Sequence, residues 1–358
     1  MKKLLLSVLL ASGSFASAQL LDSENFNTLT LGEIGTDITG VTPGQGNFLT
    51  FSTNGAAPTT STNAANDNFM VVDNGYDSTQ GLQLNGPDGN KGSRFLWRDG
   101  FADLWAAREA GNEIVEVEYD FYTGAATTST GQAGVRVYGT DETVDPAVDR
   151  VLNGYVFNLN TKILQGVCYL NNAGTYGTYL VTLQTGGLIL TEDTWYRLGL
   201  AYDTTSGETV WKVSDYSGTP LVYTGLPAAN WAGPFNPNEV DFVLAVPTTN
   251  TVSGSVIYDN YTAKATAEEA LLGTTQVNPN VAFSVSPNPA TSVVNVTAPA
   301  EVSVSQIIMT DLNGRTVKNV KVDGVSSAQV SIADLASGVY TLKVVSAQGT
   351  AVKKVIKQ

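Results

Sequence analysis

The stretch "NEIVEVEYDFY", residues 112–122, holds the side chains best suited to do chemistry in this chain. Read as a strand, it places Glu116, Glu118 and Asp120 on one face, because strand side chains alternate with a period of two. Two carboxyl groups that flank a glycosidic bond are the machinery of most glycoside hydrolases. The competing interpretation is a charged outer face in contact with solvent, which is the default for an exposed sheet surface.

The other face of the same stretch is apolar and predicts a core strand. It carries four large or β-branched side chains in strict alternation with the acids: Val115, Val117, Tyr119 and Phe121. Such alternation is typical of a strand with one buried face. The carboxylates then point away from the core, but the sequence does not choose between a concave and a convex outer surface.

Composition excludes several kinds of catalysis. The chain has no histidine and one cysteine, Cys168. A Ser-His-Asp triad, a Cys-His pair and a histidine-ligated metal site are therefore impossible. Cys168 lies in the apolar run "ILQGVCYL", which favours a buried structural thiol. Any catalysis would rest on acids, tyrosine, arginine, lysine or a hard metal ion.

Charge is unevenly distributed along the chain. Residues 19–280 carry ten lysines and arginines against 29 acids, whereas residues 281–358 carry seven against four. An acidic body disfavours nucleic acid and anionic membrane surfaces as partners. It suits solubility outside the cell and supplies oxygen ligands for calcium.

The first 18 residues have the form of a secretory signal peptide. Lys2 and Lys3 precede the short apolar run "LLLSVLLASGSFA", and small residues prepare a cleavage site before Gln19. The apolar run is too short to span a bilayer, and no other segment reaches a spanning length. We therefore expect a secreted protein with no transmembrane segment in the mature chain.

Short runs rich in β-branched and aromatic residues fill most of the chain, with Gly, Asn, Asp or Pro about every ten residues. This spacing predicts an all-β protein. We expect a large jelly-roll sandwich over 19–273, a linker at 274–283 and a small Ig-like β-sandwich over 284–358. Helices are expected only at "DGFADLWAAREAGN" (99–112) and "TAEEALLG" (266–273).

Four short pieces characterise the C-terminal part. They are "PNPA" (287–290), "DLNGR" (311–315), "LASGVYTLKV" (335–344) and "KKVIKQ" (353–358). The Asn-Gly pair of the second piece, Asn313–Gly314, predicts a hairpin. In this order the pieces resemble the type A C-terminal sorting domain of cargo for the type IX (Por) secretion system. The resemblance implies recognition by the type IX secretion machinery, export across the outer membrane, and release or attachment at the outer cell surface.

The body resembles concanavalin A-like and carbohydrate-binding jelly-roll modules through two pieces. "SENFNTLTLG" is similar to their opening segment, and "SVIYDNYTAKA" is similar to their closing strand. The resemblance implies that the first and last strands meet and that a structural calcium is held there. Carried over by position, Glu24 and Asp259 would be two of its ligands.

The alternating acids resemble the catalytic strand of laminarinase-like glycosidases, which reads E-x-D-x-E or E-x-D-x-x-E. The resemblance implies that Glu116 and Asp120 would act as nucleophile and acid/base. Here the second and third positions are Glu118 and Asp120, so the order departs from that pattern. Residues four apart on a flat strand begin about 13 Å apart, so the side chains would also have to lean together.

Aromatic and amide side chains are the candidates for sugar contact, because aromatic rings stack on sugar faces and amides bind hydroxyl groups. Trp97 lies in the polar setting "SRFLWRDG". The glycine-rich turn "YLNNAGTYGTYL" supplies four more candidates: Asn171, Asn172, Tyr176 and Tyr179. Trp195 and Trp211 are instead expected to pack between the sheets.

The leading hypothesis is a non-catalytic glycan-binding or adhesive protein, exported to the outer cell surface, with polysaccharide as its partner. One alternative is a polysaccharide-degrading glycoside hydrolase that uses Glu116 and Asp120. Another is a structural envelope or matrix protein without a discrete ligand site.

Overall fold

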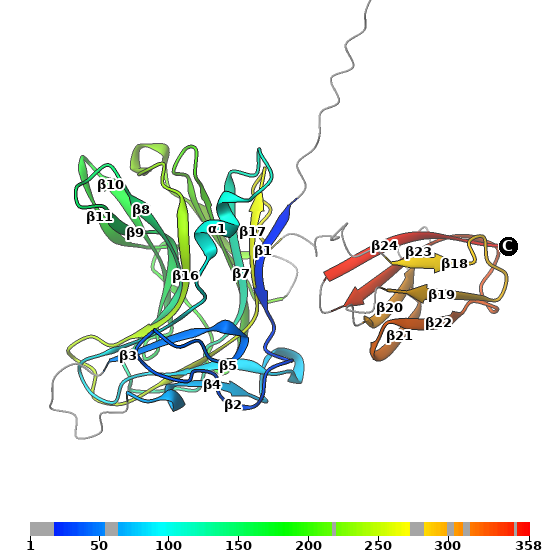
Figure 1. The fold of residues 1–358 in the computed structure, drawn as a ribbon, viewed down its shortest axis with the longest axis horizontal. Helices are drawn as coiled ribbons and strands as arrows, with labels where there is room; N and C mark the ends of the chain where they lie inside the picture. The colour runs from blue at the N-terminus through cyan, green and yellow to red at the C-terminus, as the bar shows by residue number, and fades with distance from the viewer. Residues whose placement is uncertain are drawn as a thin grey trace, which may run out of the picture. The chain divides into compact units, whose positions relative to one another are not determined.

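The computed structural model describes seven stretches of the chain: 18–53, 64–216, 220–272, 283–298, 304–310, 316–346 and 349–358. Residues 1–17 of the expected signal peptide and the expected Asn313–Gly314 hairpin lie outside them. The chain divides into two compact units, with the boundary between Leu272 and Gly273. Figure 1 shows both as strand-rich bodies.

The N-terminal unit consists of two antiparallel sheets. Sheet A runs in the order β15 (Pro220–Gly225), β14 (Thr209–Ser214), β13 (Trp195–Asp203), β7 (Ile114–Tyr122), β17 (Ser255–Thr266), β5 (Gly81–Asn85), β4 (Phe69–Val72), β2 (Gly32–Glu33), with β1 (Gln19–Glu24) also on β17. Sheet B runs in the order β11 (Thr175–Val181), β10 (Ile163–Asn172), β9 (Val148–Asn158), β8 (Gln132–Asp141), β16 (Pro237–Ala245), β6 (Ser93–Trp97), β3 (Leu49–Thr53), with β12 (Leu188–Ile189) on β10. This confirms the expected all-β jelly-roll sandwich.

The core lies between the two sheets and is rich in aromatic rings. Tyr119 and Phe121 of β7 meet Tyr155 and Phe157 of β9 edge to face, with ring centroids 6.5 and 5.0 Å apart. Edge-to-face packing of this kind adds to the free energy gained from burial. The free thiol of Cys168 is buried in the same core, as its apolar neighbours predicted.

Helix is scarce in the described residues. α1 (Phe101–Ala106) confirms the first expected helix in a shorter form, and it follows Gly100, whose φ of +93° favours glycine. The second expected helix is wrong, because the residues after β17 form bends and turns. The described residues of this unit also form four short 3-10 turns: η1 (Gln45–Asn47), η2 (Asn66–Asn68), η3 (Tyr76–Ser78) and η4 (Ala228–Asn230).

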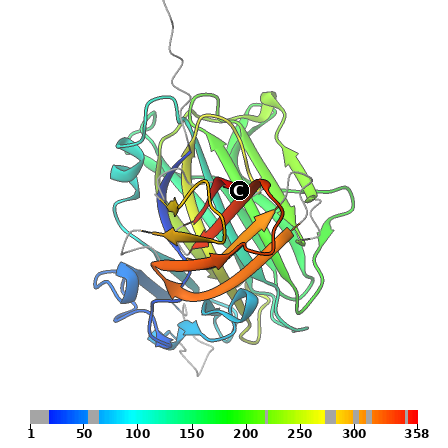
Figure 2. The same cartoon turned by 90° about the vertical axis from the view of Figure 1, so that its right-hand side faces the viewer.

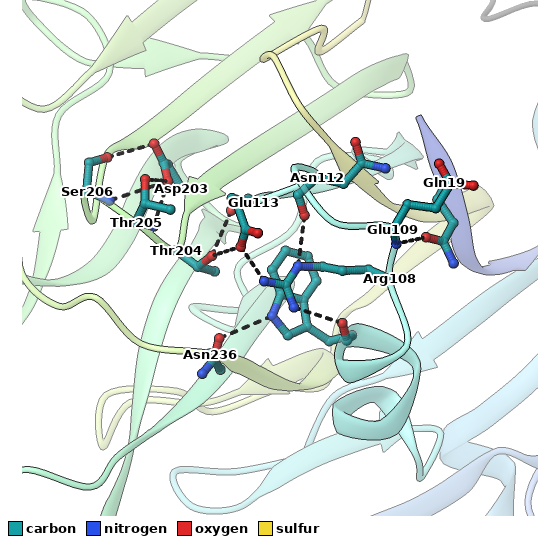
Figure 3. A network of polar contacts seen from close by, with 11 residues as sticks. Gln19, Arg108, Glu109, Asn112, Glu113, Asp203, Thr204, Thr205, Ser206 and Asn236 are labelled. Atoms are coloured by element: carbon teal, nitrogen blue, oxygen red, sulfur yellow. Dashed lines mark hydrogen bonds and ion pairs between the residues drawn. The ribbon is translucent and has the colours of Figure 1, made fainter. Parts of the chain in front are cut away.

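A polar network ties the end of α1 to the beginnings of β1 and β7 (Figure 3). The guanidinium of Arg108 lies 4.2 Å from the ring centroid of Trp105 and forms an ion pair with Glu113. The backbone N–H of Glu109 donates to the side-chain oxygen of Gln19 at 2.7 Å. The first residue of β1 is thereby fastened to the body.

The C-terminal unit has two small antiparallel sheets and a core of its own, coloured yellow to red in Figure 2. One sheet contains β18 (Ser284–Ser286), β19 (Val293–Thr297) and β22 (Ser327–Ser331). The other contains β21 (Thr316–Val325), β20 (Val304–Thr310), β23 (Gly338–Ser346) and β24 (Gly349–Lys357). Phe283, which the sequence placed in the linker, is buried in this core.

The "PNPA" piece has a definite structural role in this unit. The side chain of Asn288 donates to the carbonyl of Lys354 at 2.7 Å and accepts from the N–H of Ile356 at 2.9 Å. The backbone of Ala290 also bridges to β24, in parallel with Lys357. The piece therefore covers part of the free edge of β24, which would otherwise expose unpaired backbone groups.

Candidate functional site

The acids of β7 lie on the outer face of sheet A, opposite the core face that the sequence predicted. Glu116, Glu118 and Asp120 are nevertheless only 1%, 7% and 3% exposed. The expectation of a solvated face is therefore wrong at this strand. Burial of three carboxylates requires that something cover them and that donors or cations compensate them.

The cover is the stretch 267–272 that follows β17, called here the exit segment. The N–H of Ala270 donates to Glu116 at 2.5 Å, and the N–H of Leu272 donates to Glu118 at 2.8 Å. Leu271 between them is fully buried against sheet A. This explains why the expected helix over 266–273 does not form, since its backbone donors serve the carboxylates of β7.

Two cations compensate the acids. Arg197 of β13 bridges Asp120 at 3.0 Å and Glu118 at 3.1 Å, and Lys264 of β17 lies 3.7 Å from Glu118. Burial raises the pKa of Glu118, but Arg197 and Lys264 outweigh it and hold the pKa below its usual range. Glu116 forms no ion pair among the described residues, and burial raises its pKa to about 7.

This geometry does not favour the glycosidase hypothesis. A retaining enzyme needs two carboxyl groups with room for a sugar between them. Asp120 is held by Arg197 on one oxygen and by Asn260 on the other, at 2.7 Å. Glu116 is covered by Ala270. The three acids form an internal network that binds the exit segment to the sheet.

The expected calcium ligands do not come together. β1 and β17 pair, so the two ends of the unit meet as the resemblance implied. Glu24, however, lies opposite Tyr261, whose side chain is in the core, whereas Asp259 lies opposite Asp120 on the outer face. The two carboxylates therefore point to opposite sides of the sheet.

Each of these carboxylates is also already satisfied by protein donors. Glu24 pairs with Arg98 and accepts from the N–H of Phe26 at 2.9 Å. Asp259 accepts from the N–H of Tyr76 at 2.9 Å and from the hydroxyl of Thr79 at 2.8 Å. Two separated, saturated carboxylates do not fit one calcium ion, which takes 6–8 oxygen ligands.

The outer face of sheet B is different, because it carries an open hollow of about 320 Å³. Its lining comes from β6, β8, β9 and β16: Phe95, Tyr138, Asp149, Asn238, Glu239 and Asp241. Glu239 lies opposite Tyr138 and Asp241 lies opposite Arg136 in the pairing of β16 with β8. The intervening Val240 is buried in the core, so both acids of β16 face outward.

The acids of the hollow are poorly compensated. Asp241 is 5% exposed, and no described residue donates a hydrogen bond to its Oδ1. Burial, followed by the charge of Glu239, raises the pKa of Asp241 well above its usual range, and burial also raises the pKa of Glu239. Arg136 only partly offsets this, and no described cation forms an ion pair with either acid.

Aromatic rings continue across the outer face of sheet B on both sides of the hollow. Phe51 and Phe95 lie with ring centroids 6.4 Å apart on β3 and β6. Beyond β9, Tyr169 lies 6.2 Å from Tyr176 between centroids, and Arg150 stacks on Tyr169 at 4.4 Å. Rings and acids together form a band that crosses the strands.

Three of the five expected sugar contacts lie on this outer face. Trp97 shares the face of Phe95, and its indole N–H donates to Asp99 at 3.0 Å. Asn171 and Tyr176 are paired across β10 and β11. β9, β8 and β16 separate them from Trp97, so the sheet aligns these residues without bringing them into one pocket.

The remaining aromatic and amide expectations fall elsewhere. Tyr179 lies opposite Cys168 and packs against the core, while Asn172 is exposed at the hairpin end. Trp211 is buried between the sheets as expected. Trp195 is not, because it lies on the outer face of sheet A, 5.8 Å from Tyr76 between ring centroids.

Sequence reasoning missed the two acids of the hollow. Glu239 and Asp241 alternate with Val240 and Phe242, the same pattern that drew attention to β7. The run "EVDFVLAV" is one of the short β-rich runs that predict the sandwich, and no role is assigned to its acids from the sequence. A search for alternating acids on every expected core strand would have found both clusters.

Comparison with known families assigns the C-terminal unit. Residues 284–358 match the model of the secretion system C-terminal sorting domain. This unit is a secretion sorting domain. It confirms the type IX resemblance, and it marks the chain as cargo for export or attachment at the outer cell surface.

The chain is similar to several solved structures at low sequence identity, and no curated protein sequence matches it. The bifunctional GH43-CE protein of Bacteroides eggerthii has 10% identity and a TM-score of 0.33, over 53% of this chain and 23% of its own length. The catalytic domain of the glycoside hydrolase family 131 protein from Coprinopsis cinerea has 12% identity and a TM-score of 0.41, over 72% of this chain and 97% of its own.

A further likeness is to the exoplasmic/lumenal domain of VIP36 in a Ca²⁺/Man3GlcNAc-bound form, with 11% identity and a TM-score of 0.32, over 53% of this chain and 81% of its own. At these scores the likenesses carry no argument about the body's activity. Within the described part of the chain, no helix has the length and apolar character needed to cross a membrane.

Proposed function

We propose that the body is a non-catalytic glycan-binding module and that sugar binds along the outer face of sheet B. The observation that carries the proposal is the hollow on this face, in which rings and hydrogen-bond acceptors lie together on rigid strands. Phe95 and Tyr138 offer ring surfaces for sugar faces. Asn238 and Asp241 each hold a buried oxygen without a described donor, and sugar hydroxyl groups would supply one.

The hollow does not support a hydrolytic mechanism. Glu239 and Asp241 are neighbours on one face of one strand, close enough for the charge of Glu239 to raise the pKa of Asp241. Glycosidase carboxyl groups instead stand about 5 Å or more apart, with the scissile bond between them. The acids of β7 are covered by the exit segment. Both pairs therefore favour binding or structure over catalysis.

The sorting domain supports a location at the outer cell surface for this proposed binding activity. A module delivered to the outer surface meets extracellular polysaccharide, either on the same cell or in its surroundings. An adhesive or glycan-capturing role at the cell surface follows from the proposal. Calcium is not part of it, because Glu24 and Asp259 do not form a common site.

The test is a glycan array probed with the full chain and two variants. Tyr138→Ala removes a ring of the hollow, and Trp195→Ala removes a ring of similar accessibility from the outer face of sheet A. We expect binding to at least one polysaccharide, reduced about tenfold or more by Tyr138→Ala and little changed by Trp195→Ala.

Three results would contradict the proposal. No signal on a diverse array would favour the structural envelope alternative. A loss confined to Trp195→Ala would move the binding surface to sheet A. Release of reducing sugar from a bound polysaccharide would restore the hydrolase alternative.

A further inference from the structure

The hollow on sheet B concentrates negative charge that the protein itself leaves unpaired. Asp149, Glu239 and Asp241 all line it, and none of the three has an ion pair among the described residues. Arg136 lies opposite Asp241 in register, yet its Nε has no described partner and its charge only partly offsets the pKa shift of Asp241. This contrasts with the acids of β7, where Arg197 and Lys264 are in place.

The hollow also concentrates acceptors that lack donors. Oδ1 of Asp241 and Oδ1 of Asn238 are both buried without a hydrogen-bond partner in the described part of the chain. The amide of Asn238 is held in this orientation because its Nδ2 donates to Thr140 at 2.8 Å and to Asp149 at 3.0 Å. A buried acceptor without a donor destabilises the protein, and a ligand with N–H or O–H donors would recover that cost.

We infer that this hollow selects a sugar unit that bears a protonated amine, such as a glucosamine residue of a polysaccharide. The inference rests on the proposed glycan-binding function and adds the class of sugar. An ammonium group has three donors and no acceptor, which matches two orphan oxygens beside an uncompensated acid pair. The rings of Phe95 and Tyr138 then contact the sugar body.

Protonation of the acids and binding of an amine are coupled in this hollow. Burial, followed by the charge of Glu239, raises the pKa of Asp241, which favours its protonated form when no ligand is bound. The groups that act on this pair are Arg136 of β8, Asp149 of β9 and Asp99 after β6. An entering ammonium group lowers the pKa of Asp241 by adding a positive charge beside it, so binding releases a proton to solvent.

A metal ion is the other cation that such a cluster would suggest. No set of three or more acids, cysteines or histidines in the described residues has the arrangement to hold one. The band of rings also has no part in metal binding, whereas it matches an organic ligand with a flat face. An anionic sugar, such as a uronate, would meet the unpaired acids and be repelled.

The experiment is calorimetric titration of the full chain with three hexasaccharides of the same linkage, made of glucosamine, N-acetylglucosamine or glucose. At mildly acidic pH the glucosamine hexamer should bind about tenfold or more tightly than the other two. Its heat of binding should change with the ionisation enthalpy of the buffer, which reports proton release.

Two substitutions separate charge from shape. Asp241→Asn keeps the side-chain volume and should remove most of the preference for the amine. Glu208→Gln makes the same change of charge at an exposed position on the hairpin between β13 and β14, and it should leave the preference intact. Circular dichroism of both variants checks that they are folded.

Each contrary outcome has a distinct meaning. Equal affinity for all three sugars, or an unchanged preference in Asp241→Asn, would overturn the inference and leave glycan binding standing. Absence of binding to every sugar would contradict the proposed function itself. Competition by calcium ions, with no requirement for a sugar, would replace the amine with a metal.

Discussion

β7 and β16 carry the same pattern and put it to different uses. Both alternate acids with core residues, and both turn the acids to an outer face of the sandwich. On β7 the exit segment covers the acids, and Arg197 bridges two of them. On β16 Glu239 and Asp241 line an open hollow, and burial raises the pKa of both.

The difference lies in the partners and not in the strands. Ala270, which covers Glu116, is 154 residues away in the chain, and Arg197 is 79 residues from Glu118. Where a covering segment and a cation pack against alternating acids, the acids form a structural network. Where they do not, the same spacing leaves charge and acceptors for a ligand, and perturbed pKa values are typical of functional sites.

The largest effect should come from removing Arg197, because the acids of β7 depend on this cation and the acids of the hollow have no such ion pair among the described residues. Arg197→Met leaves Glu118 and Asp120 buried without their shared partner, which we expect to cost about 3–5 kcal/mol in the free energy of unfolding. Arg136→Met on sheet B should cost less than about 1.5 kcal/mol, because Asp241 already holds a proton there. Denaturant unfolding of both variants measures the contrast.

An equal loss of stability in the two variants would break the comparison. It would mean that Arg136 compensates the hollow as fully as Arg197 compensates the acids of β7. The hollow would then be a structural network that happens to be open, and its acids would not favour a cationic ligand.

The next effect concerns the cover. Leu271→Ala removes a fully buried side chain of the exit segment, which we expect to cost about 2–4 kcal/mol. Leu180→Ala on the outer face of sheet B should change stability by less than about 0.5 kcal/mol, since Leu180 is 51% exposed. Hydrogen exchange at the amides of Ala270 and Leu272 should accelerate only in Leu271→Ala.

Loss of stability without faster exchange at those two amides would contradict the role given to the exit segment. Leu271 would then be an ordinary core residue. The carboxylates of Glu116 and Glu118 would hold the segment by hydrogen bonds alone.

The strands and their core faces could be predicted from local pattern, whereas the covers could not. The apolar residues at alternate positions from Val115 to Phe121 predict the buried face of β7, because alternation is a property of neighbouring residues. The fate of Glu116 depended on the exit segment, whose sequence "TAEEALLG" has strong helix formers. Tertiary contacts overrode that propensity, as the acids of β7 took the backbone donors that a helix would have used.

The candidate site could be predicted only in part, because residue type is visible in the sequence whereas the register between strands is not. Trp97, Asn171 and Tyr176 were chosen by residue type, and the sheet does place them on the outer face of sheet B. Tyr179 was chosen on the same grounds but faces the core, because its position in β11 has the opposite parity. The register between strands decides which side chains face the core, and one stretch of sequence does not reveal that register.

The smallest effect is a difference in pH dependence between the two clusters. Burial raises the pKa of Glu116 from 4.5 to about 7, so the folded state binds more protons than the unfolded state in that window. Stability should therefore fall as pH rises from about 4.5 to 7. Glu116→Gln should reduce that decline by about 1–2 kcal/mol. Part of the decline should remain, because the pKa of Asp259 is raised into the same range.

Asp241→Asn should act over a different range. The pKa of Asp241 is raised further, since Glu239 adds its charge to the effect of burial, so its share of the decline extends above pH 7. The variant should lose the upper part of the slope and keep the lower part. Unfolding free energies measured at several pH values between mildly acidic and mildly alkaline conditions distinguish the two. Identical pH profiles of stability for Glu116→Gln and Asp241→Asn would contradict the comparison. They would mean that the acids of β7 and those of β16 have the same electrostatic environment.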